Sequence, residues 1–133
     1  MEITVDFPGD QRVDAHFPGF TVKTDQPSKN NPGSAPTPFS LFLSSLVTCA
    51  GIYVLGFCQQ RGLPTDRIKI TQRIERDPSI RMISKIELEI QVPPSFPEKY
   101  RSSLIRSAEL CAVKKHMENP PQFEVFTKEI PSD

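Results

Sequence analysis

Residues 39–58 decide the fold of this chain and read FSLFLSSLVTCAGIYVLGFC, twenty residues without a formal charge. A charge-free run of this length predicts a helix that is buried in a bilayer or in a protein core. Its Ser, Thr and Gly residues keep its hydrophobicity modest, and the N-terminus lacks the basic and apolar regions of a signal peptide. We therefore expect the helix of a soluble protein, covered on nearly all sides. A membrane-anchored domain stays as an alternative.

Length and charge narrow the class of protein. A chain of 133 residues has the size of one domain, so we expect a single domain over residues 1–133. A domain of this size hardly covers a helix that is apolar all round, which predicts a homo-oligomer, most simply a homodimer. Sixteen Lys and Arg balance sixteen Asp and Glu, so we expect no nucleic-acid or membrane partner. Three cysteines without a secretion signal indicate a cytoplasmic location.

The pattern along the chain predicts an α+β fold with antiparallel strands. Period-two alternation predicts six strands, at residues 2–7, 12–17, 20–24, 67–74, 82–92 and 122–130. The central helix should have Thr37 as its N-cap and end at Gly62, and a second helix should cover about residues 97–115. The order of elements is βββ-α-ββ-α-β.

The cysteines are the residues that can carry chemistry. There is no phosphate-binding loop and no Cys and His cluster at metal spacing, so we expect neither a cofactor nor a metal. If both helices pack in the core, Cys49 and Cys111 approach one another, and two such thiols can form a reversible disulfide. The alternative is that both only fill space, since free cysteine is among the most buried residue types. Cys58 follows Cys49 by nine residues, on the opposite side of the helix, and we interpret it as a packing residue.

Two segments carry a family resemblance. TPFSLFLSSLVTCAG and AELCAVKKHME resemble the osmotically inducible protein C and organic hydroperoxide resistance (OsmC/Ohr) family. In that family a proline about eleven residues before a cysteine opens the central helix, as Pro38 does before Cys49. A second cysteine lies in a Cys-Pro-Val stretch, matched here by Cys111-Ala112-Val113. The resemblance implies an OsmC-like fold, with antiparallel strands around a long central helix, in an intertwined homodimer that has two sites at the subunit interface.

The resemblance also implies an activity, that of a thiol-dependent peroxidase for organic hydroperoxides. Cys49 would attack the peroxide and become a sulfenic acid, Cys111 would resolve it as a disulfide, and a dithiol would reduce that disulfide. Arg12 is the candidate for the arginine that activates the thiolate in the family. Phe39 replaces the glutamate that holds this arginine. This departure keeps open an alternative, a catalytically weak or inactive protein of the same fold that senses redox state or binds a small ligand.

Several other side chains complete the predicted site. Glu109 is a possible substitute for the missing glutamate, and a helix that begins at Cys111 would direct its N-terminal dipole at that thiol. Apolar side chains suited to a small apolar hydroperoxide are those of Phe39, Phe42, Leu46 and Tyr53.

Overall fold

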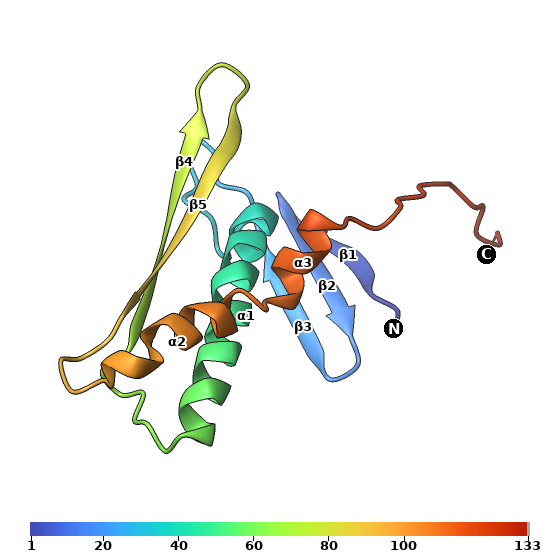
Figure 1. Cartoon of the computed structure of the whole chain (residues 1–133). Helices are drawn as coiled ribbons and strands as arrows, with labels where there is room; N and C mark the ends of the chain where they lie inside the picture. Colours follow the sequence, from blue (N-terminus) through green and yellow to red (C-terminus); the bar gives the residue numbers. More distant parts are fainter. Residues whose placement is uncertain (133) are drawn as a thin grey trace. The chain divides into compact units, whose positions relative to one another are not determined.

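The computed structural model describes residues 1–132 and shows three helices and two antiparallel sheets (Figure 1). The elements are β1 (Thr4–Gly9), β2 (Arg12–Phe17), β3 (Phe20–Thr24), α1 (Pro38–Gln60), β4 (Lys69–Asp77), β5 (Met82–Gln91), a single 3₁₀ turn η1 (Glu98–Tyr100), α2 (Arg101–Ala108) and α3 (Ala112–Glu118). The predicted α+β class and the order βββ-α-ββ-α are confirmed. The chain forms two compact units, one of residues 1–48 and 69–91 and one of residues 49–68 and 92 onward.

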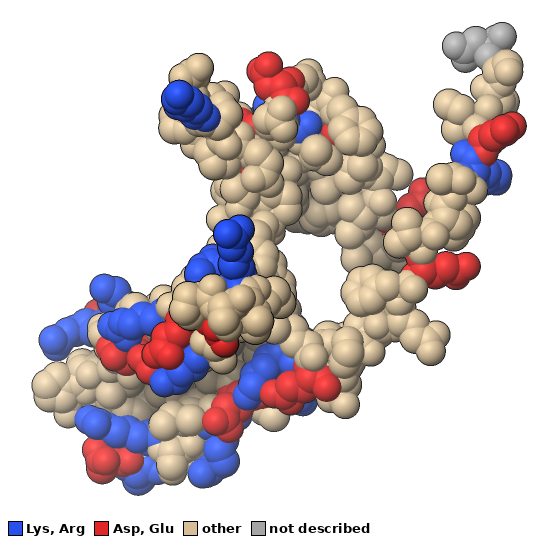
Figure 2. Space-filling view, turned by 90° about the horizontal axis from the view of Figure 1, so that it is seen from above, with Lys and Arg blue, Asp and Glu red and all other residues tan. Residues whose placement is uncertain are grey.

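The first unit holds both sheets. Strands β1, β2 and β3 pair in sequence order as the predicted antiparallel meander, with Val13 opposite Thr24 and Phe17 opposite Phe20. Strands β4 and β5 form a long hairpin in which Ile70 lies opposite Ile90. Because side chains alternate across a strand, the isoleucines gather on one face and the charged residues on the other. Lys and Arg are interspersed with Asp and Glu on the face of the molecule that Figure 2 shows.

Helix α1 begins and ends where the sequence predicts. The Thr37 hydroxyl accepts a hydrogen bond from the Ser40 N–H at 3.1 Å, which caps one of the unpaired donors of the first turn. At the other end the Leu63 N–H donates to the Cys58 carbonyl at 2.9 Å and the Gly62 N–H to the Gln59 carbonyl at 3.3 Å. Gly62 has a φ of +64°. These two bonds and the positive φ make a Schellman motif, which stops the helix.

Burial on α1 is one-sided within the single chain. Its buried residues are Leu46, Ala50, Val54, Phe57 and Cys58, which recur at helical spacing. On other sides Phe39, Ile52 and Leu55 are 47, 65 and 38 % exposed. One chain of this size supplies too little surface to surround the helix, as expected, and its cover by a partner subunit stays a prediction. By length and composition alone α1 is also apolar enough to cross a membrane.

Two predicted elements differ from the structure. The second helix is not continuous, because α2 ends at Ala108 and α3 starts at Ala112, with Cys111 between them in an extended conformation (φ −44°, ψ 120°). The Cys111 sulfur accepts a hydrogen bond from the Lys114 N–H at 3.4 Å and so caps α3. The predicted last strand at 122–130 is not formed, since a strand needs a neighbour for its backbone hydrogen bonds and this segment has none within the described chain.

Candidate active site at two thiols

The second unit brings two of the three cysteines together. Cys49 lies on α1 and is half-buried, whereas Cys111 is 2 % exposed and occupies the N-cap of α3. The Cys111 side chain forms a hydrogen bond with Cys49. The predicted approach of these two thiols is therefore confirmed, and the break between α2 and α3 is what places Cys111 at a helix start.

Backbone amides surround the Cys49 sulfur and change its acidity. The pKa of Cys49 is lowered, first by a hydrogen bond from the Val113 N–H, then by the Cys111 side chain and the Ala112 N–H, while partial burial opposes them. Both amides belong to the first turn of α3, whose N–H groups have no partner inside the helix. They donate to the sulfur most strongly when it is a thiolate, so they favour the reactive form. We expected a helix start to act on Cys111; α3 starts one residue later, and its first-turn amides act on both sulfurs, that of Lys114 on Cys111 and those of Ala112 and Val113 on Cys49.

Cys58 lies in the opposite kind of environment. It is fully buried, and this burial raises the pKa of its thiol, although the positive charge of Arg61 opposes the rise. A buried thiol with a raised pKa is unreactive. The interpretation of Cys58 as a packing residue is confirmed.

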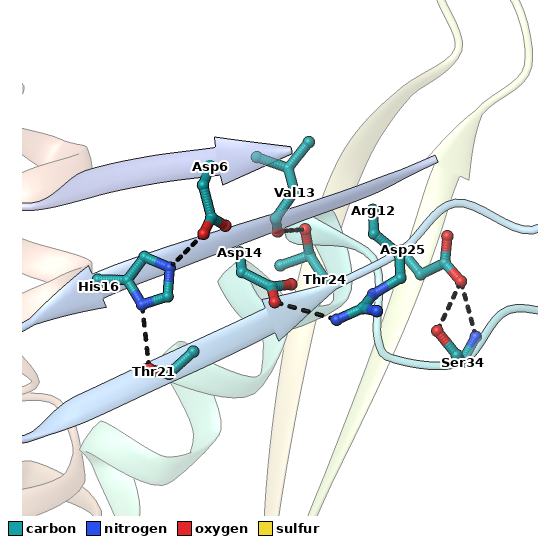
Figure 3. A network of polar contacts seen from close by, with 9 residues as sticks. All are labelled: Asp6, Arg12, Val13, Asp14, His16, Thr21, Thr24, Asp25 and Ser34. Carbon is teal, nitrogen blue, oxygen red and sulfur yellow. Dashed lines mark hydrogen bonds and ion pairs between the residues drawn. The ribbon is translucent and has the colours of Figure 1, made fainter. Parts of the chain in front are cut away.

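Arg12 belongs to the first unit, where a carboxylate holds it (Figure 3). One guanidinium nitrogen of Arg12 lies 3.0 Å from a carboxylate oxygen of Asp14, whose side chain is buried. The charge of Arg12 also acts on Asp25. Our sequence reasoning looked for this carboxylate at residue 39 or at Glu109 and missed Asp14. The sequence did allow this pair to be proposed, because residues two apart on a strand, such as Arg12 and Asp14, point to the same face.

Asp25 fixes the loop that follows β3. It is 2 % exposed and accepts hydrogen bonds of 2.8 Å from the Gln26 N–H, the Ser34 N–H and the Ser34 hydroxyl. These bonds, the Ser34 N–H first, hold the pKa of Asp25 below its ordinary value. The loop of residues 25–37 between β3 and α1 is thus closed on itself through one carboxylate (Figure 3).

The predicted substrate-binding residues lie along α1. The Phe39 and Phe42 rings contact each other at 5.5 Å between centroids, and the Arg76 guanidinium lies 5.9 Å from the Phe39 ring. Leu46 is buried, whereas Tyr53 lines a groove between α1 and α2. On an α-helix, positions 42, 46, 49 and 53 share one face. Glu109 is exposed at the C-cap of α2 and forms no ion pair among residues 1–132.

Acidic, His and Cys side chains do not gather into a metal site anywhere in the described chain. A half-buried thiol with a lowered pKa, backbone donors that favour its thiolate form and a second thiol within hydrogen-bond reach are the groups needed to form and resolve a sulfenic acid.

Comparisons with known proteins agree on a family and a fold. The sequence matches the OsmC-like protein family over residues 31–126. No curated protein matches the chain. A structure from Psychrobacter arcticus is similar at 23 % identity over 85 % of each chain, with a TM-score of 0.64. An OsmC-like protein from Mycoplasma pneumoniae has 16 % identity over 90 % of this chain and 87 % of its own, with a TM-score of 0.68. The organic hydroperoxide resistance protein OhrB of Bacillus subtilis has 18 % identity over 89 % of this chain and 90 % of its own, with a TM-score of 0.52.

Proposed function

The chain belongs to the OsmC-like protein family, and from this premise we propose that it is a thiol-dependent peroxidase that reduces organic hydroperoxides. The observation that supports the proposal best is the environment of Cys49. Its pKa is lowered by two backbone amides, and the Cys111 thiol lies beside it. Perturbed acidity and a specific partner group, found together, are features typical of catalytic residues.

In the proposed reaction the Cys49 thiolate attacks the terminal oxygen of a hydroperoxide ROOH. The O–O bond breaks, the alkoxide leaves and takes a proton to give ROH, and Cys49 becomes a sulfenic acid. The Cys111 sulfur then attacks the Cys49 sulfur, a disulfide forms and water leaves. A dithiol reductant returns both thiols by disulfide exchange and is itself oxidised to a disulfide.

The substrate class follows from the side chains near Cys49 on α1. Phe42, Leu46 and Tyr53 share the face of Cys49 by helical spacing, and Phe39 lies one turn before Phe42. These apolar side chains favour a small apolar hydroperoxide over hydrogen peroxide. Arg12 is the proposed cation near the Cys49 thiolate. Since residue 39 is a phenylalanine, Asp14 would hold the Arg12 guanidinium in place of the family's glutamate.

The assembly is proposed as a homodimer in the cytoplasm. A second copy would cover exposed apolar residues of α1 such as Phe39 and Leu55 and offer neighbours to the apolar residues of 119–132. In that reading α1 is the central helix of a soluble protein rather than a membrane span, in keeping with the family match over residues 31–126.

A second candidate function is a redox sensor or ligand-binding protein with the same fold. It is favoured by Phe39, which cannot hold an arginine as a glutamate does. In that case the Cys49 to Cys111 disulfide would form slowly and without turnover.

The test uses the reduced protein with one equivalent of cumene hydroperoxide or of hydrogen peroxide, followed by thiol mapping with mass spectrometry. We expect a Cys49 to Cys111 disulfide that forms faster with cumene hydroperoxide. Cys49→Ser should abolish peroxide consumption, and Cys111→Ser should allow one turnover that leaves a sulfenic acid. Cys58→Ser is the matched control and should stay active. Full activity of Cys49→Ser would refute the assignment, and thiols that stay reduced for hours would favour the second candidate.

A further inference from the structure

The second unit contains an open groove between the C-terminal half of α1 and helix α2. Neither Cys49 nor Cys111 is among its lining residues, although Tyr53, which we propose for the peroxide site, is one of them. The volume of the groove is about 530 Å³, within the usual range of small-molecule sites. The α1 side of the groove contributes Ile52, Tyr53, Gly56, Phe57, Gln60 and Arg61, and the α2 side contributes Ser103, Arg106, Ser107 and Leu110. Ile52, Phe57 and Leu110 give the groove apolar walls, and the absence of a side chain at Gly56 leaves it open.

Two arginines provide the charge of this groove. Arg61 and Arg106 both line it, and neither Asp nor Glu is among its lining residues. Among residues 1–132 neither arginine forms an ion pair, although exposed arginines elsewhere do, as Arg101 does with Glu98 at 2.9 Å. A guanidinium has five donors in a planar fork that fits carboxylate and phosphate groups. The groove therefore carries two positive charges that nothing in it neutralises.

The Arg61 side chain is held in place by the groove itself. Its guanidinium stacks on the Phe57 ring at 3.6 Å from the centroid and donates a hydrogen bond of 3.1 Å to the Phe57 carbonyl. A second ring, that of Tyr100, lies 5.4 Å away. Stacking and one backbone bond fix the plane of the guanidinium while its other donors remain for a ligand.

Arg106 is placed by a single contact on its own helix. It donates to the Ser103 hydroxyl at 2.9 Å, and Ser103 and Ser107 add further hydroxyl groups to the lining. Among residues 1–132 Arg106 does not stack on an aromatic ring as Arg61 does, so it can be replaced with little effect on folding.

We propose that this groove binds an amphipathic anion, a short apolar chain that ends in a carboxylate or phosphate group. Arg61 and Arg106 hold the anionic end, and the chain lies against the walls formed by Ile52, Phe57 and Leu110. The assignment concerns binding alone, so it holds independently of any reaction at Cys49. The charge complementarity and the apolar walls together specify the ligand, since neither feature alone distinguishes an amphiphile from a free anion or a neutral chain.

Isothermal titration calorimetry of the full chain tests the proposal with four probes, octyl phosphate, octanoate, octan-1-ol and inorganic phosphate. We expect octyl phosphate or octanoate to bind at least about tenfold more tightly than octan-1-ol and inorganic phosphate, about 1.4 kcal/mol. The tighter of the first two identifies the head group. Equal affinity for octan-1-ol, equal affinity for inorganic phosphate, or no binding of either amphiphile would overturn the proposal.

Variants of the two arginines, compared with a control arginine on the same helix, test where the anionic end of the ligand binds. Arg106→Gln should weaken octyl phosphate binding by about tenfold or more, as expected from the loss of a charge-assisted hydrogen bond. Arg101→Gln, on the same helix but paired with Glu98 and outside the groove, should bind like the wild type. Arg61→Gln should also lose binding, and circular dichroism will show whether it folds, since Arg61 packs on Phe57. Wild-type affinity in Arg106→Gln, or an equal loss in Arg101→Gln, would refute the proposal.

Discussion

Gly62, which follows α1, and Gly56, inside α1, should respond in opposite directions to the same substitution. Gly62 ends the helix with a φ of +64°, and an added Cβ would meet no atom within 4 Å, so Gly62→Ala adds backbone strain and no clash. An L-residue in the left-handed region costs about 1–2 kcal/mol. The smaller entropy of the unfolded alanine chain returns about 0.4–1 kcal/mol. We expect a net loss of about 1 kcal/mol in the free energy of unfolding.

Gly56 is the matched control. It lies inside α1 and not at its end, and its added Cβ also meets nothing within 4 Å. Alanine is favoured over glycine in a helix interior by about 0.8–1 kcal/mol, so Gly56→Ala should stabilise the protein. Thermal unfolding followed by circular dichroism should move the midpoint by about 3–5 °C in opposite directions. A Gly62→Ala protein as stable as Gly56→Ala would refute the assignment of the Schellman motif.

Other predictions follow from the acidities of individual groups. Because backbone amides lower the pKa of Cys49 and burial raises that of Cys58, iodoacetamide at neutral pH should label Cys49 first, as read by mass spectrometry. Ala112→Pro fits the first helical position of α3 but removes one amide donor, so the pH profile of Cys49 labelling should move to higher pH in a protein that still folds. Asp25, whose pKa Ser34 lowers, should add stability above its ordinary pKa of 3.8 that is lost as the pH falls through its folded pKa. Urea midpoints from pH 5 to 2 should show a smaller pH dependence in Ser34→Ala.

Much of the fold could be predicted because its signals are local. Alternation sets the strands of the meander and the hairpin, and Thr37, Pro38 and Gly62 set the ends of α1 through caps that depend on nearby residues. The break at residues 109–111 escaped prediction. Glu, Leu and Cys do not interrupt a helical pattern, and the cap that starts α3 is a sulfur acceptor, which is not among the preferred capping groups.

The site could be predicted in part. The thiol pair was identified from the two cysteines and a family resemblance, and the structure places them within hydrogen-bond reach. The donors to Cys49 are backbone amides, which no residue type reveals in a sequence. Asp14 was missed although the predicted strand at 12–17 contains both residues, because alternation puts Arg12 and Asp14 on one face without showing that their side chains pair.

The exposed C-terminal segment affects how long the protein persists in a cell before it is degraded. Phe123, Val125, Phe126 and Ile130 are 75–96 % exposed, and their backbone has no strand to pair with in the described chain. Extended apolar segments of this kind are what chaperones hold and proteases cut. A single chain would therefore be degraded faster than a covered one, so the lifetime of the protein should rise with its own concentration. Quality control would then keep the proposed assembly and remove the excess of unassembled chains.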